Sequence, residues 1–139
     1  MAVCPDASFV LAWFVPTSAS QAASDIWRQL LRRSEPLIAP PLLYAEVTSV
    51  LRRYAASGAI TGADTLAAIR HLFRIPIAVS HSQSLYERAL ELAERLGQSR
   101  AYDSQYMAVA DLEGCALFTL DQGLYNSAQR MGITARLIA

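Results

Sequence analysis

The chain has 139 residues, a hydrophobic content of 53% and 12 acidic side chains balanced by 12 basic ones. A chain of this length can bury one full core, and its neutral balance argues against a coat protein that holds nucleic acid by bulk positive charge. The longest apolar run, Phe9–Val15, is too short to span a membrane, and the N-terminus has no signal-peptide pattern. We therefore expect a cytoplasmic protein with a single domain over residues 1–139.

Short apolar runs of strand length alternate with longer helical patterns along the whole chain. In chain order we expect strand Ala2–Pro5, helices Ala7–Phe14 and Ala19–Arg33, strand Leu37–Ala39, helices Pro41–Ser57 and Gly62–Phe73, strand Ile75–Val79, helices Ser82–Leu96 and Ala101–Glu113, strand Ala116–Leu120, helix Gln122–Met131 and strand Ala135–Ile138. Apolar strands that alternate with helices predict a parallel sheet covered on both faces. The expected fold class is α/β, a three-layer α/β/α sandwich with a central parallel sheet of about five strands.

Several common sites are missing from the sequence. The two cysteines, Cys4 and Cys115, lie in short β-like runs away from any Cys/His cluster, so we expect buried reduced thiols and no zinc site. Neither a phosphate-binding glycine loop nor a G-x-S-x-G nucleophile motif is present. Nucleotide binding through those loops and covalent catalysis are therefore not expected.

Four acids interrupt apolar stretches, where a carboxylate is costly unless it is hydrogen-bonded, paired or bound to a cation. They are Asp6, Glu46, Asp103 and Asp121, and all 12 positive residues of the chain are arginines, none of them adjacent to these acids. Acids gathered without an organic counter-charge indicate a hard metal ion, and hence metal-assisted chemistry on phosphate.

The predicted elements allow the four acids to converge. Asp6 and Asp121 each follow a predicted strand, and ligands in parallel sheets bind at the carboxyl ends of the strands. Glu46 shares a helix face with Leu43, and Asp103 lies in line with Tyr106 on another helix. We expect all four carboxylates to point to one place above the sheet.

Each acid also has an ordinary structural interpretation. Asp6 and Asp121 suit helix N-caps, and Asp103 suits the dipole of a first helical turn. Glu46 lies about one turn inside its helix on the apolar side, and its nearest alternative partner is Arg53, seven residues on. These alternatives remain open at the level of the sequence.

The residues resemble those of the PIN-domain family, most closely the small VapC-like ribonuclease toxins of toxin–antitoxin pairs. The similarity covers nearly the full length, and the segments that carry it are "VCPDAS", "PPLLYAEVTSVLRR", "AYDSQYMAVA" and "LFTLDQGL", which contain the four acids in order. Two details depart from the family pattern. Ser49 stands where many relatives carry Asn, and Gln122-Gly123-Leu124 lacks the basic residues often found there.

The resemblance implies an endoribonuclease of a toxin–antitoxin pair that works as a homodimer and is inhibited by a cognate antitoxin. Mg²⁺ or Mn²⁺, one ion or two, would be held by the four acids, and RNA phosphodiester bonds would be hydrolysed by a metal-activated water. Ser8 and Thr119 are candidates for supporting the ligands, and Arg53 and Arg100 for contacting the RNA backbone.

Two other functions are compatible with the same residues. One is a PIN-like nuclease that processes DNA or structured RNA. The other is a non-catalytic α/β interaction domain whose acids serve only as helix caps.

Overall fold

A parallel five-stranded sheet forms the centre of the protein, which a computed structural model describes over residues 1–139. The spatial order of the strands is β3-β2-β1-β4-β5, and every neighbouring pair is parallel. The strands are β1 (Val3–Pro5), β2 (Leu37–Ala39), β3 (Ile77–Val79), β4 (Ala116–Thr119) and β5 (Ala135–Leu137). The predicted parallel sheet of five strands is confirmed.

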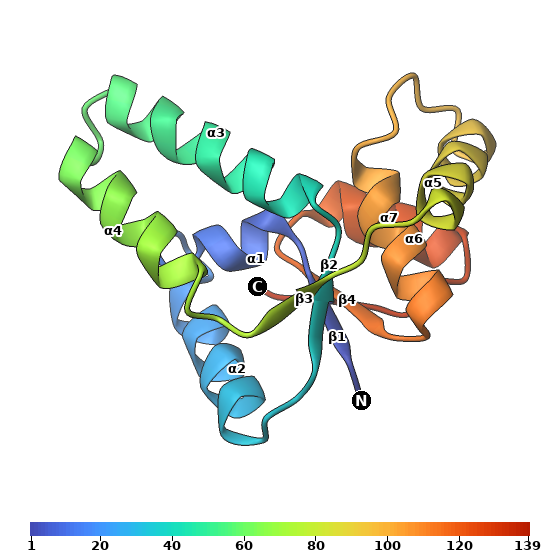
Figure 1. Cartoon of the computed structure of the whole chain (residues 1–139), viewed down its shortest axis with the longest axis horizontal. Helices are drawn as coiled ribbons and strands as arrows, with labels where there is room; N and C mark the ends of the chain where they lie inside the picture. The colour runs from blue at the N-terminus through green and yellow to red at the C-terminus, as the bar shows by residue number, and fades with distance from the viewer.

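Seven helices cover the two faces of this sheet and complete the three layers (Figure 1). They are α1 (Ala7–Leu11), α2 (Ser20–Arg32), α3 (Leu42–Ala56), α4 (Gly62–Leu72), α5 (Gln83–Arg95), α6 (Asp103–Glu113) and α7 (Gln122–Arg130). Figure 1 shows α1–α4, in blue to green, on one side of the strands and α5–α7, in yellow to red, on the other. None of the seven combines the length and the apolar character that a membrane crossing requires.

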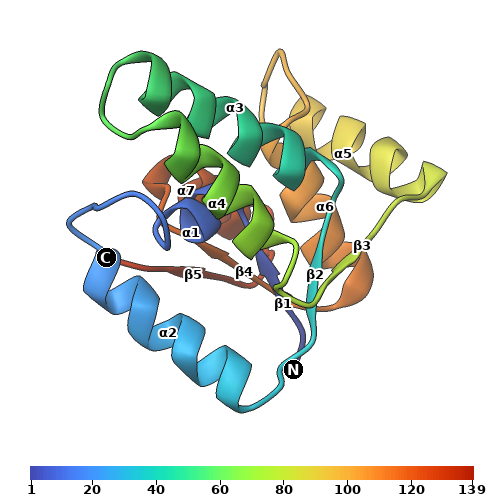
Figure 2. The same ribbon diagram turned by 60° about the vertical axis from the view of Figure 1, so that its left-hand side comes forward.

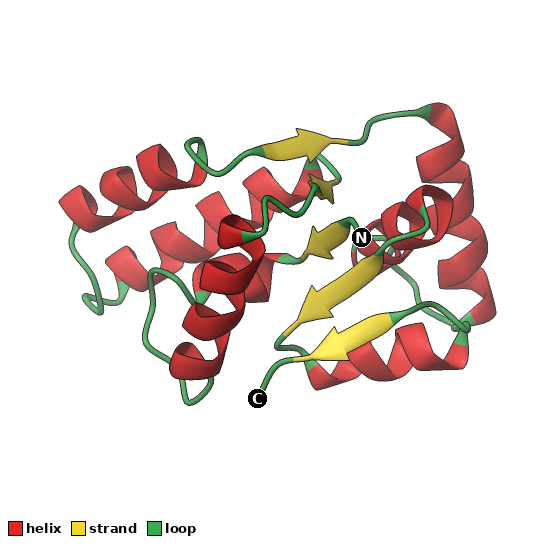
Figure 3. Ribbon diagram, turned by 90° about the horizontal axis from the view of Figure 1, so that it is seen from below, coloured by secondary structure: helices red, strands yellow, loops and turns green.

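The central strands are apolar because both of their faces are covered. All three residues of β1 are buried, and α6 packs on β1, β2 and β4 while α1 packs on β4 from the opposite side. Each strand is parallel to its neighbours, and Figure 3 shows the strands, in yellow, between the helices as seen from below. The carboxyl ends of β1 and β4 therefore meet at one edge of the sheet.

Two predicted boundaries differ from the structure, and a proline explains each. Helix α1 ends at Leu11 and not at Phe14, because Val15 precedes Pro16 and a residue before proline disfavours helical geometry. Strand β3 begins at Ile77 and not at Ile75, because Pro76 has no N–H to donate to the sheet. The other elements lie within two residues of their predicted ends.

A single cluster of 34 buried residues forms the hydrophobic core, and aromatic rings join α1 to α2 within it. The rings of Phe9 and Trp27 stack with their centroids 4.3 Å apart. The indole Nε1–H of Trp27 donates to the carbonyl of Phe9 at 3.0 Å, whereas the amide of Trp13 donates to Val10. Trp27 therefore satisfies a carbonyl that the short helix α1 leaves free, and α2 packs along the sheet as Figure 2 shows.

We predict that Trp27→Phe lowers the free energy of unfolding by about 2–4 kcal/mol, because it strips a buried carbonyl of its donor and shrinks a packed ring. Urea denaturation followed by circular dichroism measures this change. The control is Trp13→Phe, which removes a half-buried indole that makes no hydrogen bond; we expect it to cost about 1 kcal/mol. Equal losses in the two variants would contradict the role given to the Trp27 hydrogen bond.

Candidate active site

Asp6 and Asp121 lie at the same edge of the sheet, because β1 and β4 are parallel neighbours in register. Asp6 directly follows β1, and its amide continues the pairing by donating to the carbonyl of Phe118 at 3.1 Å. Asp121 follows β4 after one intervening residue. These two strands are neighbours, so two acids that are far apart in sequence belong to one edge.

Both aspartates are also helix caps, as the alternative interpretation holds. The Oδ1 atom of Asp6 accepts from the amide of Phe9 at 2.9 Å, and the Oδ1 atom of Asp121 accepts from the amide of Leu124 at 3.1 Å. A capping carboxylate uses one oxygen for the helix. Asp121 is exposed and its Oδ2 atom remains available, so the capping role and a ligand role are compatible.

Asp6 is 4% exposed and is held by two hydroxyl groups that the sequence singled out as supports. Its Oδ1 accepts from Ser8 Oγ at 2.7 Å, and its Oδ2 accepts from Thr119 Oγ1 at 2.5 Å. Ser8 Oγ in turn accepts from the amide of Leu120, and Thr119 Oγ1 from the amide of Asp121, each at 2.9 Å. This network fixes the Asp6 carboxylate to both β4 and α1.

Glu46 is held by a residue that the sequence did not mark. It projects from α3 and is partly buried, and the hydroxyl of Tyr106 donates to its Oε1 at 2.5 Å. Tyr106 is 1% exposed and comes from α6. The suggested pair between Glu46 and Arg53 does not form, because Arg53 takes part in none of the four ion pairs of the structure. The feature of the sequence that could have pointed to Tyr106 is its position one helical turn after Asp103.

Asp103 is the first residue of α6 and is partly exposed. An acid at this position suits the dipole of the helix, as expected from the sequence. Burial raises the pKa of its carboxyl, and the charge of Asp121 raises it further. The negative charge of Asp121, at the end of β4, therefore acts on Asp103.

Burial and neighbouring charge also raise the pKa of Asp6 and of Glu46. For Asp6 burial dominates and raises the pKa to about 6, against the lowering effect of its hydrogen bonds from Thr119, Ser8 and Phe9; the charge of Asp121 adds to the rise. For Glu46 burial is again the largest cause, the Tyr106 hydrogen bond lowers the pKa, and the charge of Asp103 raises it. The charge of Asp121 therefore acts on Asp6 and Asp103, and the charge of Asp103 acts on Glu46.

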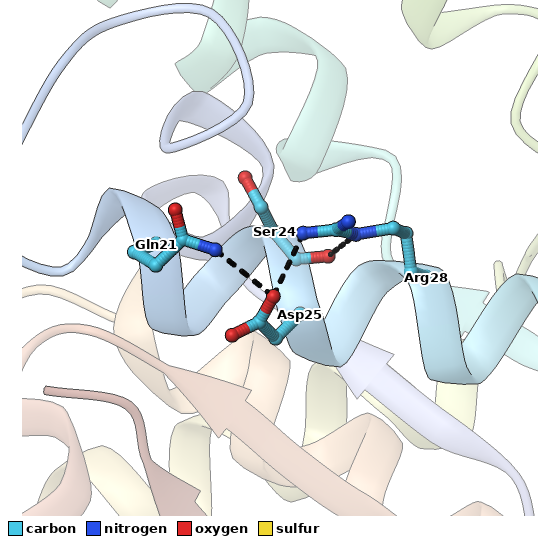
Figure 4. Close-up of polar contacts among 4 residues, drawn as sticks. All are labelled: Gln21, Ser24, Asp25 and Arg28. Atoms are coloured by element: carbon cyan, nitrogen blue, oxygen red, sulfur yellow. Dashed lines mark hydrogen bonds and ion pairs between the residues drawn. The ribbon is translucent and has the colours of Figure 1, made fainter.

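No cation of the protein neutralises these acids. The four ion pairs involve Glu35, Asp25, Glu91 and Asp111. Figure 4 shows the contrast at Asp25, an exposed acid of α2 whose Oδ1 accepts from Arg28 at 2.7 Å and from Gln21 at 3.0 Å. These four surface acids have a positively charged partner, whereas Asp6, Glu46 and Asp121 have only hydroxyl and amide donors.

The donor set fits a hard cation in its chemistry, since carboxylate oxygens are the ligands that Mg²⁺ and Mn²⁺ prefer. The spacing is wider than a site with three direct ligands, because no group of three His, Cys, Asp or Glu side chains lies close enough to hold one ion. Mg²⁺ usually keeps several of its waters and uses one or two carboxylates directly. The expected meeting of all four carboxylates around one ion is therefore not seen, and an ion here would need water as part of its ligand shell.

The two arginines that the sequence offered for RNA contact lie in different places relative to the acids. Arg53 and Arg100 are both exposed, and neither forms an ion pair. Arg100 lines an open cavity together with Asp103, whereas Arg53 lies near the end of α3. The two cysteines are buried free thiols, as expected.

The raised pKa of Asp6 predicts a pH-dependent stability in the absence of divalent ions. The native state holds this proton more tightly than the unfolded state, so the free energy of unfolding falls as the pH rises from about 4 to about 6. In Asp6→Asn the free energy of unfolding should fall by about 3 kcal/mol less over this pH range. Urea titrations in EDTA across this range measure the slope. Asp25→Asn should keep the wild-type slope, and an unchanged slope in Asp6→Asn would contradict the assignment.

A second prediction concerns the hydroxyl that holds Glu46. A hydrogen bond to the ionised carboxylate stabilises the charged form, so Tyr106→Phe should raise the pKa of Glu46 above its wild-type value. Carbon-13 NMR titration of the glutamate side-chain carboxyls, again in EDTA, measures this shift. Tyr125→Phe, on α7, is the matched control and should leave Glu46 unchanged. A Glu46 pKa that is the same in Tyr106→Phe and wild type would show that the hydrogen bond has no electrostatic effect.

Comparison with known structures places the fold among toxins and their complexes. VapC20 of Mycobacterium tuberculosis, described as a toxin that cleaves the sarcin–ricin loop, superposes with a TM-score of 0.70 at 19% identity, over 90% of this chain and 94% of that one. PAE2754 of Pyrobaculum aerophilum superposes with a TM-score of 0.68 at 28% identity, over 97% of this chain and 92% of that one.

Comparison of sequences gives the family directly. A VapC ribonuclease of Mycobacterium bovis and ribonuclease VapC9 of Mycobacterium tuberculosis are each 33% identical to the chain over 117 residues, which cover 83% of this chain and 90% of theirs. The PIN-domain family model matches residues 3–129 and so includes β1, β4 and all four acids. The chain therefore belongs to the PIN-domain family and, within it, to the VapC group.

Proposed function

We propose that this protein is a divalent-metal-dependent endoribonuclease and the toxin of a toxin–antitoxin pair. Its membership of the VapC group and its 33% identity to VapC ribonucleases support the activity. One observation in the structure carries the proposal: the Asp6 carboxylate is buried at the sheet edge without a cation and under the charge of Asp121. Burial makes the charge of this acid costly, and a bound cation would offset that cost.

Asp6, Glu46, Asp103 and Asp121 would hold Mg²⁺ or Mn²⁺, directly or through water. When bound, the ion would supply Lewis acidity, which lowers the pKa of a coordinated water and offsets charge on the phosphate oxygens. Neighbouring side chains of the protein fix the orientation of these acids. Thr119 and Ser8 fix the orientation of Asp6, and Tyr106 fixes that of Glu46.

Asp103 differs from the other three acids in that its carboxylate accepts no hydrogen bond, whereas those of Asp6, Glu46 and Asp121 do. Its carboxylate oxygens are free to accept a proton from the attacking water and to orient that water toward phosphorus. Arg53 and Arg100 would contact phosphates of the RNA backbone, since both guanidinium groups are exposed and without ion-pair partners.

The partner we propose is a cognate antitoxin protein, and the toxin itself would act as a homodimer. The VapBC-1 complex of Haemophilus influenzae and the VapBC2 complex of Rickettsia felis share the fold, with TM-scores of 0.69 and 0.67. Size-exclusion chromatography with light scattering of the isolated chain measures its oligomeric state.

We predict that Asp6→Asn or Glu46→Gln lowers the rate of RNA cleavage by on the order of 100-fold or more, because each removes a charged oxygen ligand. The assay uses a labelled single-stranded RNA with Mg²⁺ or Mn²⁺, and EDTA should stop the reaction. Asp25→Asn is the control and should cleave at the wild-type rate, since Asp25 lies on the exposed face of α2.

A second measurement separates metal binding from catalysis. Calorimetric titration with Mn²⁺ should show binding to the wild type and a weaker affinity in both variants. Wild-type cleavage by Asp6→Asn would overturn the site. Cleavage of single-stranded DNA with equal efficiency would instead favour a processing nuclease, and failure of the wild type to bind Mn²⁺ would favour an interaction domain.

A further inference from the structure

The loop between α5 and α6 forms the wall of an open cavity beside the proposed catalytic acids. The cavity has a volume of about 490 Å³ and is lined by Gly97, Gln98, Ser99, Arg100, Tyr102 and Asp103. Figure 1 shows this loop standing out from the body of the molecule above α5 and α6. Because Asp103 belongs to the lining, whatever occupies the cavity lies next to the proposed site of cleavage.

Tyr102 is the only apolar side chain of this lining and is 53% exposed. Isolated exposed aromatic residues are common and need no function on their own. The position of Tyr102 is different because it directly precedes Asp103, and its ring belongs to none of the aromatic pairs of the fold. An aromatic face is therefore available beside a carboxylate that is assigned to chemistry on phosphate.

The backbone around Tyr102 is anchored, so its ring is presented from a defined turn. The carbonyl of Tyr102 accepts from the amide of Gln105 at 3.0 Å, and the carbonyl of Ala101 accepts from Gln105 Nε2 at 2.8 Å. A stacking surface held by such bonds loses less conformational entropy on binding than one on a free loop.

Arg100 adds a positively charged side chain to the same cavity. Its side chain is exposed and takes part in no ion pair, so its guanidinium donors are free. An arginine offsets the repulsion that Asp103 exerts on an approaching phosphate, and its planar fork suits phosphate oxygens. An aromatic face and a guanidinium together match a nucleotide whose base is unstacked, as in single-stranded RNA.

We propose that Tyr102 and Arg100 form a subsite for one unstacked nucleotide of the RNA, immediately beside the bond that is cleaved. Tyr102 stacks on the base and Arg100 contacts a phosphate of the same strand. This subsite rests on the proposed ribonuclease function and adds to it a reason for preferring single-stranded over helical RNA. The contact is to the face of the base and therefore selects unpaired nucleotides more strongly than a particular base.

The test compares Tyr102→Ala, Tyr102→Phe and the control Tyr86→Ala, which removes an exposed tyrosine of α5. Fluorescence anisotropy in EDTA measures binding of a labelled single-stranded RNA without cleavage. Loss of one base stack should weaken binding roughly 5- to 150-fold in Tyr102→Ala. Tyr102→Phe and Tyr86→Ala should bind as the wild type does. With Mg²⁺, the loss in Tyr102→Ala should appear in KM, while Mn²⁺ affinity and the midpoint of urea unfolding stay unchanged.

An abasic scan identifies the contact itself. Removing one base at successive positions of the RNA should weaken wild-type binding at one position next to the cleaved bond, and should have no further effect there in Tyr102→Ala. Arg100→Gln should lower the slope of log affinity against log salt by about 0.7, the value for one phosphate of a single strand. Arg95→Gln, at the exposed end of α5, should keep the wild-type slope.

The proposal is overturned if Tyr102→Ala binds and cleaves RNA like the wild type, or if the abasic scan gives the same profile in both proteins. A fall in Mn²⁺ affinity or in stability of the same size as the fall in RNA affinity would assign Tyr102 a purely structural role and also overturn it. If the wild type cleaves RNA, these results concern the subsite alone. If the wild type cleaves no RNA in Mn²⁺, the ribonuclease function fails first, and the subsite fails with it.

Discussion

The buried carboxylate of Asp6 is the constraint on which the rest of this structure depends. It lies at the carboxyl end of the central strand β1, where an unsatisfied charge would be very costly. Donors from two elements satisfy it: Ser8 and the amide of Phe9 in α1, and Thr119 at the end of β4. The register of β1 with β4, the start of α1 and the position of Asp121 are thereby tied to one side chain.

Asp6, Glu46 and Asp121 accept hydrogen bonds, but no positively charged group of the protein compensates their negative charge. The charge of Asp121 acts on Asp6 and on Asp103, and the charge of Asp103 acts on Glu46. Surface acids of the same protein are paired with arginines, so cations are not in short supply. Selection for stability alone would not retain uncompensated acids at a sheet edge. The proposed site for a divalent ion and an anionic substrate would explain why they are retained.

The candidate site is assembled from secondary-structure elements that the core holds rigidly. Tyr106 reaches from α6 to Glu46 on α3, and its ring is part of the same core as Phe9 and Trp27. The substrate side is different, because Tyr102 and Arg100 lie on the loop that precedes α6. Placing the acids on a rigid scaffold and the nucleotide contacts on a connecting loop allows the preference for RNA to change while the chemistry is kept.

The sequence by itself determined the elements, the parallel sheet and the identity of the four acids, because periodicity, proline and glycine act over a few residues and acids in apolar stretches stand out. The end of α1 and the starts of β3 and α6 lie two or three residues from their predicted positions, and the other ends lie within one residue. The sequence offered Ser8 and Thr119 as supports, but only the tertiary structure decided which acid each donor holds and added Tyr106, since the Tyr106–Glu46 and Thr119–Asp6 bonds join residues 60 and 113 positions apart. Such pairs depend on how helices pack on the sheet, and no local pattern in the chain specifies that geometry.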